Sequence, residues 1–172
     1  MVKQEKNYNL KKRLNSNGFT LIELLVVIFI MALISGSVMV GSWRGQNQYA
    51  VSRAVQKMSA DLHRVQSMAL AGKTQGAITP SGYGLYSQSA SQYQLFYNTG
   101  ASQVYDGSSV VMETVTLAKA ALAPVGSNIF FTPPNPTTYI NGGLGGSQTF
   151  TIISGGYAKN VTVFSGGRIE ID

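Results

Sequence analysis

The most informative part of this 172-residue chain is Asn17-Gly18-Phe19-Thr20-Leu21-Ile22-Glu23-Leu24-Leu25-Val26-Val27-Ile28-Phe29-Ile30. A basic segment at residues 11–13 precedes it, and apolar residues continue beyond it to Val40. As a helix, about 22 residues rising ~1.5 Å each reach ~33 Å, roughly the thickness of a bilayer's hydrocarbon core. The pattern therefore predicts a membrane helix with its cationic flank in the cytoplasm and the C-terminal body outside.

Glu23 is the carboxylate that interrupts this apolar run. A carboxylate inside a membrane segment costs ~2.5–3.5 kcal/mol on insertion scales and normally has a partner. No cation lies within helical reach of Glu23 in the run, but cleavage after Gly18 would give Phe19 a free α-amine four residues away. That amine could pair with Glu23 of the same or a neighbouring subunit. Because a buried ion pair specifies register more surely than it adds stability, we interpret the stretch as an assembly device.

The residues from Gly18 to Leu24 resemble the class III signal of type IV pilins and type II secretion pseudopilins. The resemblance implies that a prepilin peptidase cuts after Gly18 and methylates the new N-terminus at Phe19. It also implies that Glu23 is the family glutamate that registers subunits in a filament. The expected fold is α+β and pilin-like: a long N-terminal helix, hydrophobic in its first half and amphipathic in its second, packed on a C-terminal antiparallel β-sheet head.

Two other interpretations of the apolar run stay open. An ordinary signal anchor explains the run and its basic flank but leaves Glu23 unexplained. A secretory signal peptide would place a small-residue cleavage site at Ser35-Gly36-Ser37. The length of the run and the presence of Glu23 both disfavour this second alternative.

The composition excludes several kinds of site. The chain has no Cys, which excludes disulfides, thiolate metal sites and a cysteine nucleophile. Of the formal net charge of +6, the leader contributes +4 and the remainder only +2, which is weak evidence for a nucleic-acid partner. Charged residues make up only 12% of the chain, a low share that is typical of an uncharged, polar extracellular surface. The leader's charges are Lys3, Lys6, Lys11, Lys12, Arg13 and Glu5.

The sequence divides into three parts. Residues 1–18 are interpreted as a leader peptide, residues 19–45 as a transmembrane or filament-core helix half, and residues 46–172 as a globular head. Within the head we expect an amphipathic helix at residues 46–71 followed by a β-sheet at residues 77–172.

The amphipathic part continues the helix. Its apolar residues recur at spacings of four and three, which places them on one face, and Gly72 is a natural helix end. One helix is therefore expected over residues 19–71, with local melting around Gly36 to Gly45 left open. The heptad pattern of apolar residues does not persist for enough repeats to form a coiled coil, so a sheet is the expected partner of this helix. The stripe is Val51, Val55, Met58, Leu62, Val65 and Ala69, with Arg53, Lys57, Asp61 and Arg64 largely off it.

Short β-type runs separated by turn residues fill the rest of the chain. Residues 82–86 and 92–97 predict a hairpin, and Ser165-Gly166-Gly167 predicts another between the last two runs. Pro133 ends a strand because Pro cannot continue a ladder, and residues 133–146 are expected to form a loop. The remaining strands are expected at residues 109–117, 128–132, 148–153, 160–164 and 168–171.

The C-terminal part resembles the GspH/FimT class of minor pseudopilins. The similarity rests on a Phe-Thr-Pro-Pro segment at 131–134, a Phe-Thr-Ile strand at 150–152 and the closing hairpin at 161–169. It implies a low-abundance subunit. The closing segment departs from the DNA-binding branch of this class, because Arg168 is followed by two acidic residues rather than by further basic ones.

No catalytic group, metal site or cofactor is predicted. His63 stands alone without Cys partners, so we interpret it as a packing or surface residue. The Gly-rich run at residues 142–146 lacks a following Lys and helix, which favours a surface loop over a phosphate loop. Four tyrosines are expected in the core and edges of the sheet rather than on an adhesive surface. They are Tyr83, Tyr86, Tyr93 and Tyr97.

The sequence thus predicts a structural subunit, minor in abundance, of a type IV pilus-like or type II secretion pseudopilus filament. Its expected partners are prepilin peptidase, other pilin or pseudopilin subunits, the inner-membrane assembly platform and the membrane itself. It is expected as a single-pass inner-membrane protein with a cytoplasmic N-terminus and an extracytoplasmic head, and afterwards in a periplasmic or extracellular filament. The alternatives are a DNA- or surface-binding minor pilin, with nucleic acid not favoured, and a secreted or anchored enzyme, which is favoured least.

Overall fold

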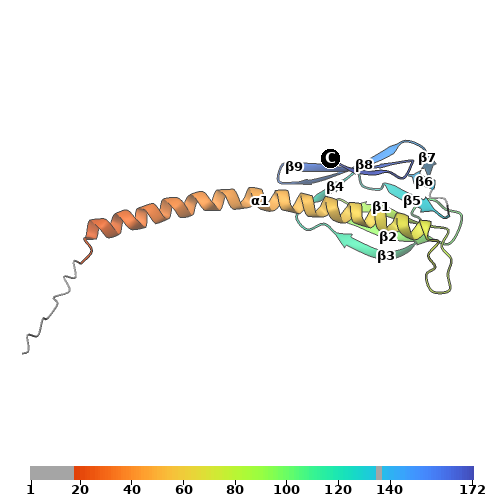
Figure 1. Cartoon of the computed structure of the whole chain (residues 1–172), viewed down its shortest axis with the longest axis horizontal. Coiled ribbons are helices and arrows are strands. Elements are labelled where there is room, and N and C mark those ends of the chain that lie inside the picture. Colours follow the sequence, from red (N-terminus) through yellow and green to blue (C-terminus); the bar gives the residue numbers. More distant parts are fainter. Residues whose placement is uncertain (1–17, 135–136) are drawn as a thin grey trace, which may run out of the picture. The chain divides into compact units, whose positions relative to one another are not determined.

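The computed structural model describes residues 18–134 and 137–172, with the side chains of residues 37–44 left aside (Figure 1). The predicted leader, except for Gly18, lies outside the described residues. The chain forms two compact units, Met1–Val40 and Gly41–Asp172. The described part has a long helix and an antiparallel sheet head, so the predicted α+β class is confirmed.

The helix α1 covers Leu21–Leu70, close to the predicted 19–71, and it remains helical through Gly36 and Gly45. Gly72 ends it with a positive φ of 53°. Gly72 N donates to Ala69 O at 3.0 Å, and Lys73 N donates to Met68 O at 3.1 Å. These two bonds form a Schellman motif, in which a left-handed Gly lets the last carbonyls of a helix be satisfied.

Among the described residues of the unit Gly41–Asp172, ten strands form two antiparallel sheets. The six-stranded sheet has the order β3-β2-β1-β5-β6-β7, and the four-stranded sheet has the order β10-β9-β8-β4. Both predicted hairpins are present, as the pairs β1–β2 and β9–β10. The strands are β1 Gly82–Ser89, β2 Gln92–Asn98, β3 Val110–Thr116, β4 Ala121–Ala123, β5 Asn128–Thr132, β6 Thr137–Ile140, β7 Gly143–Leu144, β8 Ser147–Ser154, β9 Tyr157–Phe164 and β10 Ile169–Ile171.

The prediction of a continuous loop at residues 133–146 was wrong. β6 and β7 lie within this segment, where β6 pairs with β5 and then with β7. β4, which pairs with β8, was not predicted either. These strands are two to four residues long, too short for an alternating apolar pattern, so only pairing with a distant partner defines them.

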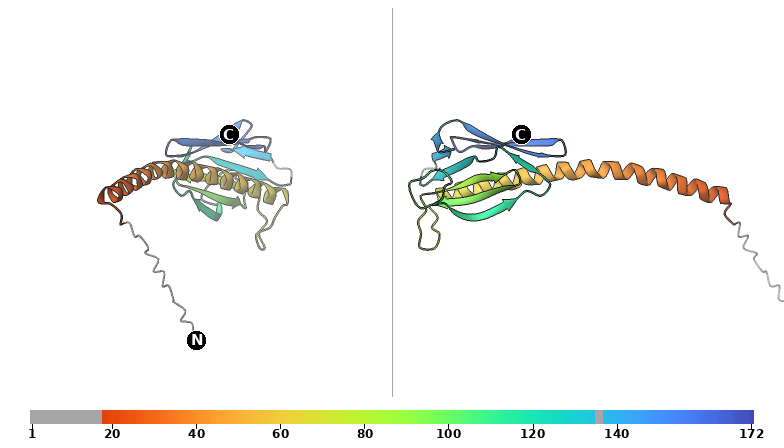
Figure 2. Two further views of the ribbon diagram at one scale, coloured as in Figure 1. Left: turned by 60° about the vertical axis from the view of Figure 1, so that its left-hand side comes forward. Right: turned by 180° about the vertical axis from the view of Figure 1, so that it is seen from behind.

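The core of this unit surrounds the apolar stripe of α1. All six predicted stripe residues are at most 2% exposed. They form one cluster with side chains from both sheets, including Leu95 of β2 and Phe150 of β8. In Figures 1 and 2 the strands β8 and β9 lie on one side of this part of α1, and β2 and β3 lie on the other. One prediction about this helix was wrong: Asp61, expected off the stripe, is only 3% exposed.

Two Gly-rich turns of the four-stranded sheet lie directly on α1. Gln66 Nε2 donates to Gly167 O at 2.8 Å. At the other end of the sheet, a side chain at Gly155 would overlap Asn47, and Gly155 also has a positive φ of 53°. Glycine at these turns therefore allows the sheet to approach the helix closely at both ends.

Glycine is also required inside β1, where aromatic rings cover the face of the sheet. A Cβ at Gly84 would lie 2.7 Å from the Phe96 ring and 2.5 Å from Ile129 O. Phe96 in turn stacks on Phe130, with ring centroids 5.8 Å apart. The strand therefore has room for these rings only because Gly84 lacks a side chain.

We predict that Gly84→Ala lowers the free energy of unfolding by ~1–3 kcal/mol, because overpacking forces backbone or ring shifts. Gly100→Ala is the matched control, since a Cβ there has no described atom within 4 Å. Thermal unfolding of the full chain in detergent, followed by near-UV circular dichroism, measures both variants. Equal melting temperatures for the two variants would contradict the proposed close packing.

Candidate functional site

The predicted cleavage site lies just before α1. Gly18 and Phe19 are exposed and precede the first helical residue, Leu21. A Cβ built on Gly18 has no atom of the described residues within 4 Å. The fold of the described chain therefore places no steric demand for glycine at this position.

Thr20 is the N-cap of α1, a feature that the sequence analysis missed. Thr20 Oγ1 accepts a hydrogen bond from Glu23 N at 3.2 Å, and Thr20 O accepts one from Leu24 N at 3.2 Å. Thr and Glu at this spacing match the capping-box pattern, which could have been found as Thr-x-x-Glu before an apolar run. Glu23 thus lies in the first turn, where a carboxylate interacts favourably with the helix dipole.

The helix that follows exposes its apolar side chains all round. From Leu21 to Ile34 the large apolar side chains are between 42% and 83% exposed. Such a continuous apolar surface marks a contact with lipid or with other proteins. The exposed large apolar side chains are those of Leu21, Ile22, Leu24, Leu25, Val26, Val27, Ile28, Phe29, Ile30, Met31, Leu33 and Ile34.

Among the residues that the structure describes, no helix combines the length and the apolar character needed to cross a membrane.

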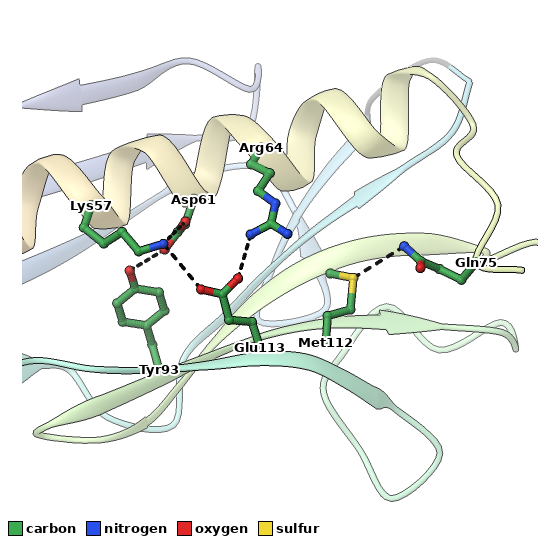
Figure 3. Close-up of polar contacts among 7 residues, drawn as sticks. All are labelled: Lys57, Asp61, Arg64, Gln75, Tyr93, Met112 and Glu113. Atoms are coloured by element: carbon green, nitrogen blue, oxygen red, sulfur yellow. Dashed lines mark hydrogen bonds and ion pairs between the residues drawn. The ribbon is translucent and has the colours of Figure 1, made fainter.

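A cluster of charged side chains joins α1 to β2 and β3 in the head (Figure 3). Lys57 Nζ lies 2.8 Å from Asp61 Oδ1 and 3.4 Å from Glu113 Oε1. Arg64 donates to Glu113 Oε2 at 2.6 Å, and Tyr93 Oη donates to Asp61 Oδ2 at 2.7 Å. Two cations and two carboxylates therefore compensate one another, and the buried Asp61 accepts bonds on both oxygens.

Burial and the contacts in this cluster shift the pKa of three of its members, Lys57, Tyr93 and Glu113. Burial, and then the hydrogen bond to Asp61, raise the pKa of Tyr93 far above its ordinary value, so the hydroxyl remains a donor. The hydrogen bond to Asp61 raises the pKa of Lys57. The hydrogen bond from Arg64 lowers the pKa of Glu113. Each of these three shifts favours the protonation state in which the group bonds its partner, which indicates a structural joint between α1 and the sheet.

The other candidate residues do not gather into a reactive site. His63 is exposed, and among the described residues no group of His, Asp and Glu could hold a metal ion. Tyr83, Tyr93 and Tyr97 are buried, as predicted for core residues. Tyr86 is half-buried and stacks on Tyr105, with ring centroids 4.3 Å apart.

The closing hairpin neutralises its own cation. Arg168 Nη1 lies 2.9 Å from Glu170 Oε1, and its guanidinium lies over the Phe164 ring at 4.2 Å. A guanidinium held in this way is less available to a phosphate group, and this disfavours the nucleic-acid alternative.

Comparison with protein families finds a match at the N-terminus. Residues 13–39 match the model of the prokaryotic N-terminal methylation motif, the signal of type IV pilins and pseudopilins. The resemblance at Gly18 to Leu24 is thereby confirmed, and the motif supports a type IV pilin-like or pseudopilin subunit. Comparison with curated proteins gives no match, and neither does comparison with solved structures.

The motif implies a membrane-anchored pilin that prepilin peptidase processes and that later assembles with other pilins into a filament. It also favours a structural subunit over an enzyme. The GspH/FimT class is not confirmed.

We predict that the joint makes stability depend on pH through Glu113. Since its pKa is lowered from the ordinary 4.5, its contribution is fully present above that value and is lost as the pH falls through the folded-state pKa. As the pH falls from the ordinary 4.5 through the folded-state pKa, the Glu113→Gln variant should lose less stability than the wild type does. The difference should be less than ~1 kcal/mol because the pair is partly exposed.

Arg64→Gln is the matched partner variant, and it should reduce the pH dependence by a similar amount. The double variant should add nothing further, because both changes remove one interaction. Melting temperatures across the pH range give the result. An unchanged pH dependence in both single variants would show that the Arg64–Glu113 contact contributes no stability.

Proposed function

We propose that this chain is made as a membrane-inserted prepilin, is cut after Gly18 and methylated at Phe19, and then serves as a structural subunit of a type IV pilus-like or type II secretion pseudopilus filament. The observation that carries the proposal is the arrangement at the start of α1. An exposed Gly18-Phe19 bond precedes the helix, and a helix with exposed apolar side chains follows it. A single carboxylate, Glu23, stands in its first turn.

The membrane is the proposed first partner of the apolar segment. The basic residues 11–13 favour a cytoplasmic N-terminus and an extracytoplasmic head. The large apolar side chains from Leu21 to Ile34 need cover, first from lipid and later from neighbouring subunits. The inner-membrane assembly platform is the proposed site of this exchange.

Glu23 is the proposed registering group. Its backbone N–H is satisfied by Thr20, while its carboxylate lies one turn of helix from the α-amine that cleavage would create at Phe19. Pairing this carboxylate with the amine of the same or a neighbouring subunit removes an unpaired charge from the apolar environment only when subunits pack correctly. The Thr20 cap fixes where the helix begins, and it thereby fixes the position of Glu23 relative to Phe19.

The low-abundance assignment stays a prediction from the sequence, and quantitative mass spectrometry of sheared filaments would decide it. A DNA- or surface-binding role of the head is the second candidate. The neutralised Arg168 and the small net charge outside the leader both disfavour DNA as the ligand.

We predict that the mature protein begins with N-methylated Phe19 in cells that contain prepilin peptidase. Intact-mass and N-terminal peptide analysis measure this directly. Gly18→Leu should retain the leader and stay out of filaments, because the α-amine is never created. Gly36→Ala is the control, and it should leave processing unchanged. A mature N-terminus near Ser37 in the wild type would refute the processing proposal and support a secretory signal peptide.

Glu23→Gln separates the helix-capping role of Glu23 from its proposed role as a charged partner of the α-amine. Glutamine also suits the third position of a helix but carries no charge. We predict that Glu23→Gln and Glu23→Ala are both processed and are both at least about tenfold depleted from sheared filaments. The reason is that breaking a buried ion pair costs ~3–5 kcal/mol. Immunoblots of cell and filament fractions measure the ratio. Normal incorporation of Glu23→Gln alone would reduce the role of Glu23 to helix capping.

A further inference from the structure

A groove lies between α1 and the end of β3 in the unit Gly41–Asp172. Its volume is about 630 Å³. One wall is formed by α1 residues between Gln46 and Lys57, and the other by residues 115–119. β3 is the edge strand of the six-stranded sheet, so the groove also borders an edge that no other described strand covers.

The groove combines apolar lining with excess positive charge. Ala50, Ala54 and Leu117 contribute apolar surface, and Arg53, Lys57 and Lys119 bring three cations. Lys57 is already compensated by Asp61 and Glu113. Among the described residues, Arg53 and Lys119 have no carboxylate within ion-pair distance, and Lys119 Nζ instead donates to Gln46 Oε1 at 3.2 Å.

These features define the chemistry of the occupant. Uncompensated cations beside apolar surface favour a segment with carboxylates next to an apolar side chain. Tyr49, which is 73% exposed and lines the same groove, adds a large amphipathic contact surface of the kind found in interfaces.

The end of β10 has this chemistry on the same protein. Asp172 follows Ile171, which is 45% exposed, whereas Glu170 is already paired with Arg168 at 2.9 Å. β10 is itself the edge strand of the four-stranded sheet. The segment cannot fill the groove of its own chain, because Asp172 is bonded to Asn160 of β9 through both backbone groups at 3.0 Å.

The groove and the β10 end lie at the same level along α1. The turn before β9 contacts Asn47 through Gly155. β9 begins at Tyr157, and because a strand rises ~3.3 Å per residue, Asn160 lies ~10 Å further along β9. The same distance along α1, at ~1.5 Å per residue, leads from Asn47 to about Arg53. Asp172, bonded to Asn160, is therefore level with Arg53, while β3 and the β8–β9 pair lie on different sides of α1 (Figures 1 and 2).

We infer that the groove binds the segment 170–172 of a second copy of this chain. Arg53 and Lys119 lie where they can pair with the carboxylate of Asp172, and Ile171 covers the apolar surface. Two copies inserted in one membrane are parallel, so the groove of one copy can meet the segment of the next. Because groove and segment are different surfaces, the contact is heterologous and leaves a free groove and a free segment for further copies. The inference rests on the proposed filament function, and it requires that copies of this chain are neighbours in the filament, contrary to the low-abundance prediction.

The test uses the absence of Cys from the chain, because two introduced thiols are then the only ones present. Ala118→Cys lines the groove and Ile171→Cys lies in the segment, and neither change removes a charge. We predict that the full chain with both changes, oxidised mildly in intact cells, gives dimers and longer ladders in the sheared filament fraction. Each single variant can give a dimer at most. The control pair is Ala77→Cys with Ile171→Cys, in which Ala77 is exposed in the segment after α1, and it should give no ladder.

Charge variants test the recognition itself. Adding Arg53→Glu to the cross-linking pair should reduce the ladder at least about tenfold, and adding Asp172→Arg as well should restore it. The inference is overturned if neither charge change alters the amount of cross-linked ladder. It is also overturned if the thiols cross-link only to a different protein or do not cross-link at all.

Processing and filament incorporation are measured in the same samples. A processed chain that enters filaments without a ladder overturns the groove contact and leaves the filament function standing. A chain that is neither processed nor incorporated overturns both.

Discussion

Burial of one face of α1 is the constraint on which the head depends. Met58, Leu62 and Val65 are fully buried, and each such side chain contributes ~1.5–3 kcal/mol when it leaves water. The two sheets bury this face by packing on the helix from different sides, and they share one hydrophobic cluster with it. Because both sheets pack on the same helix, a strand that loses its contact with α1 also exposes the apolar side chains that it buries there.

The same burial creates the polar joint. Asp61 enters the buried region, and an unpaired carboxylate there would be costly. Lys57 and Tyr93 satisfy it, while Glu113 connects Lys57 and Arg64 to the edge strand β3. The joint therefore fixes β3 beside α1, and the cationic groove lies next to that joint because Lys57 belongs to both. Stability and the proposed contact surface thus have a common origin.

The N-terminal segment has a different character from the head. Its helix begins at a Thr cap and presents apolar side chains to its surroundings, so its stability and its function depend on what covers it. The methylation motif lies in this segment and supports a pilin-like or pseudopilin subunit. The head, by contrast, has its own core, and its proposed contribution is a lateral contact through edges that the two sheets leave uncovered.

Features that depend on neighbouring residues could be predicted from the amino-acid sequence. The processing signal, the long helix, its stripe from Val51 to Ala69, its end at Gly72 and the two hairpins all follow from local spacing. Only folding brings Tyr93 to Asp61, 32 residues away in the chain, and Arg64 to Glu113, 49 residues away, and only folding defines the short strands β4, β6 and β7. The physical reason is that periodicity shows which face of an element is apolar, whereas a buried charge or a short strand is stabilised only by groups that folding brings from elsewhere.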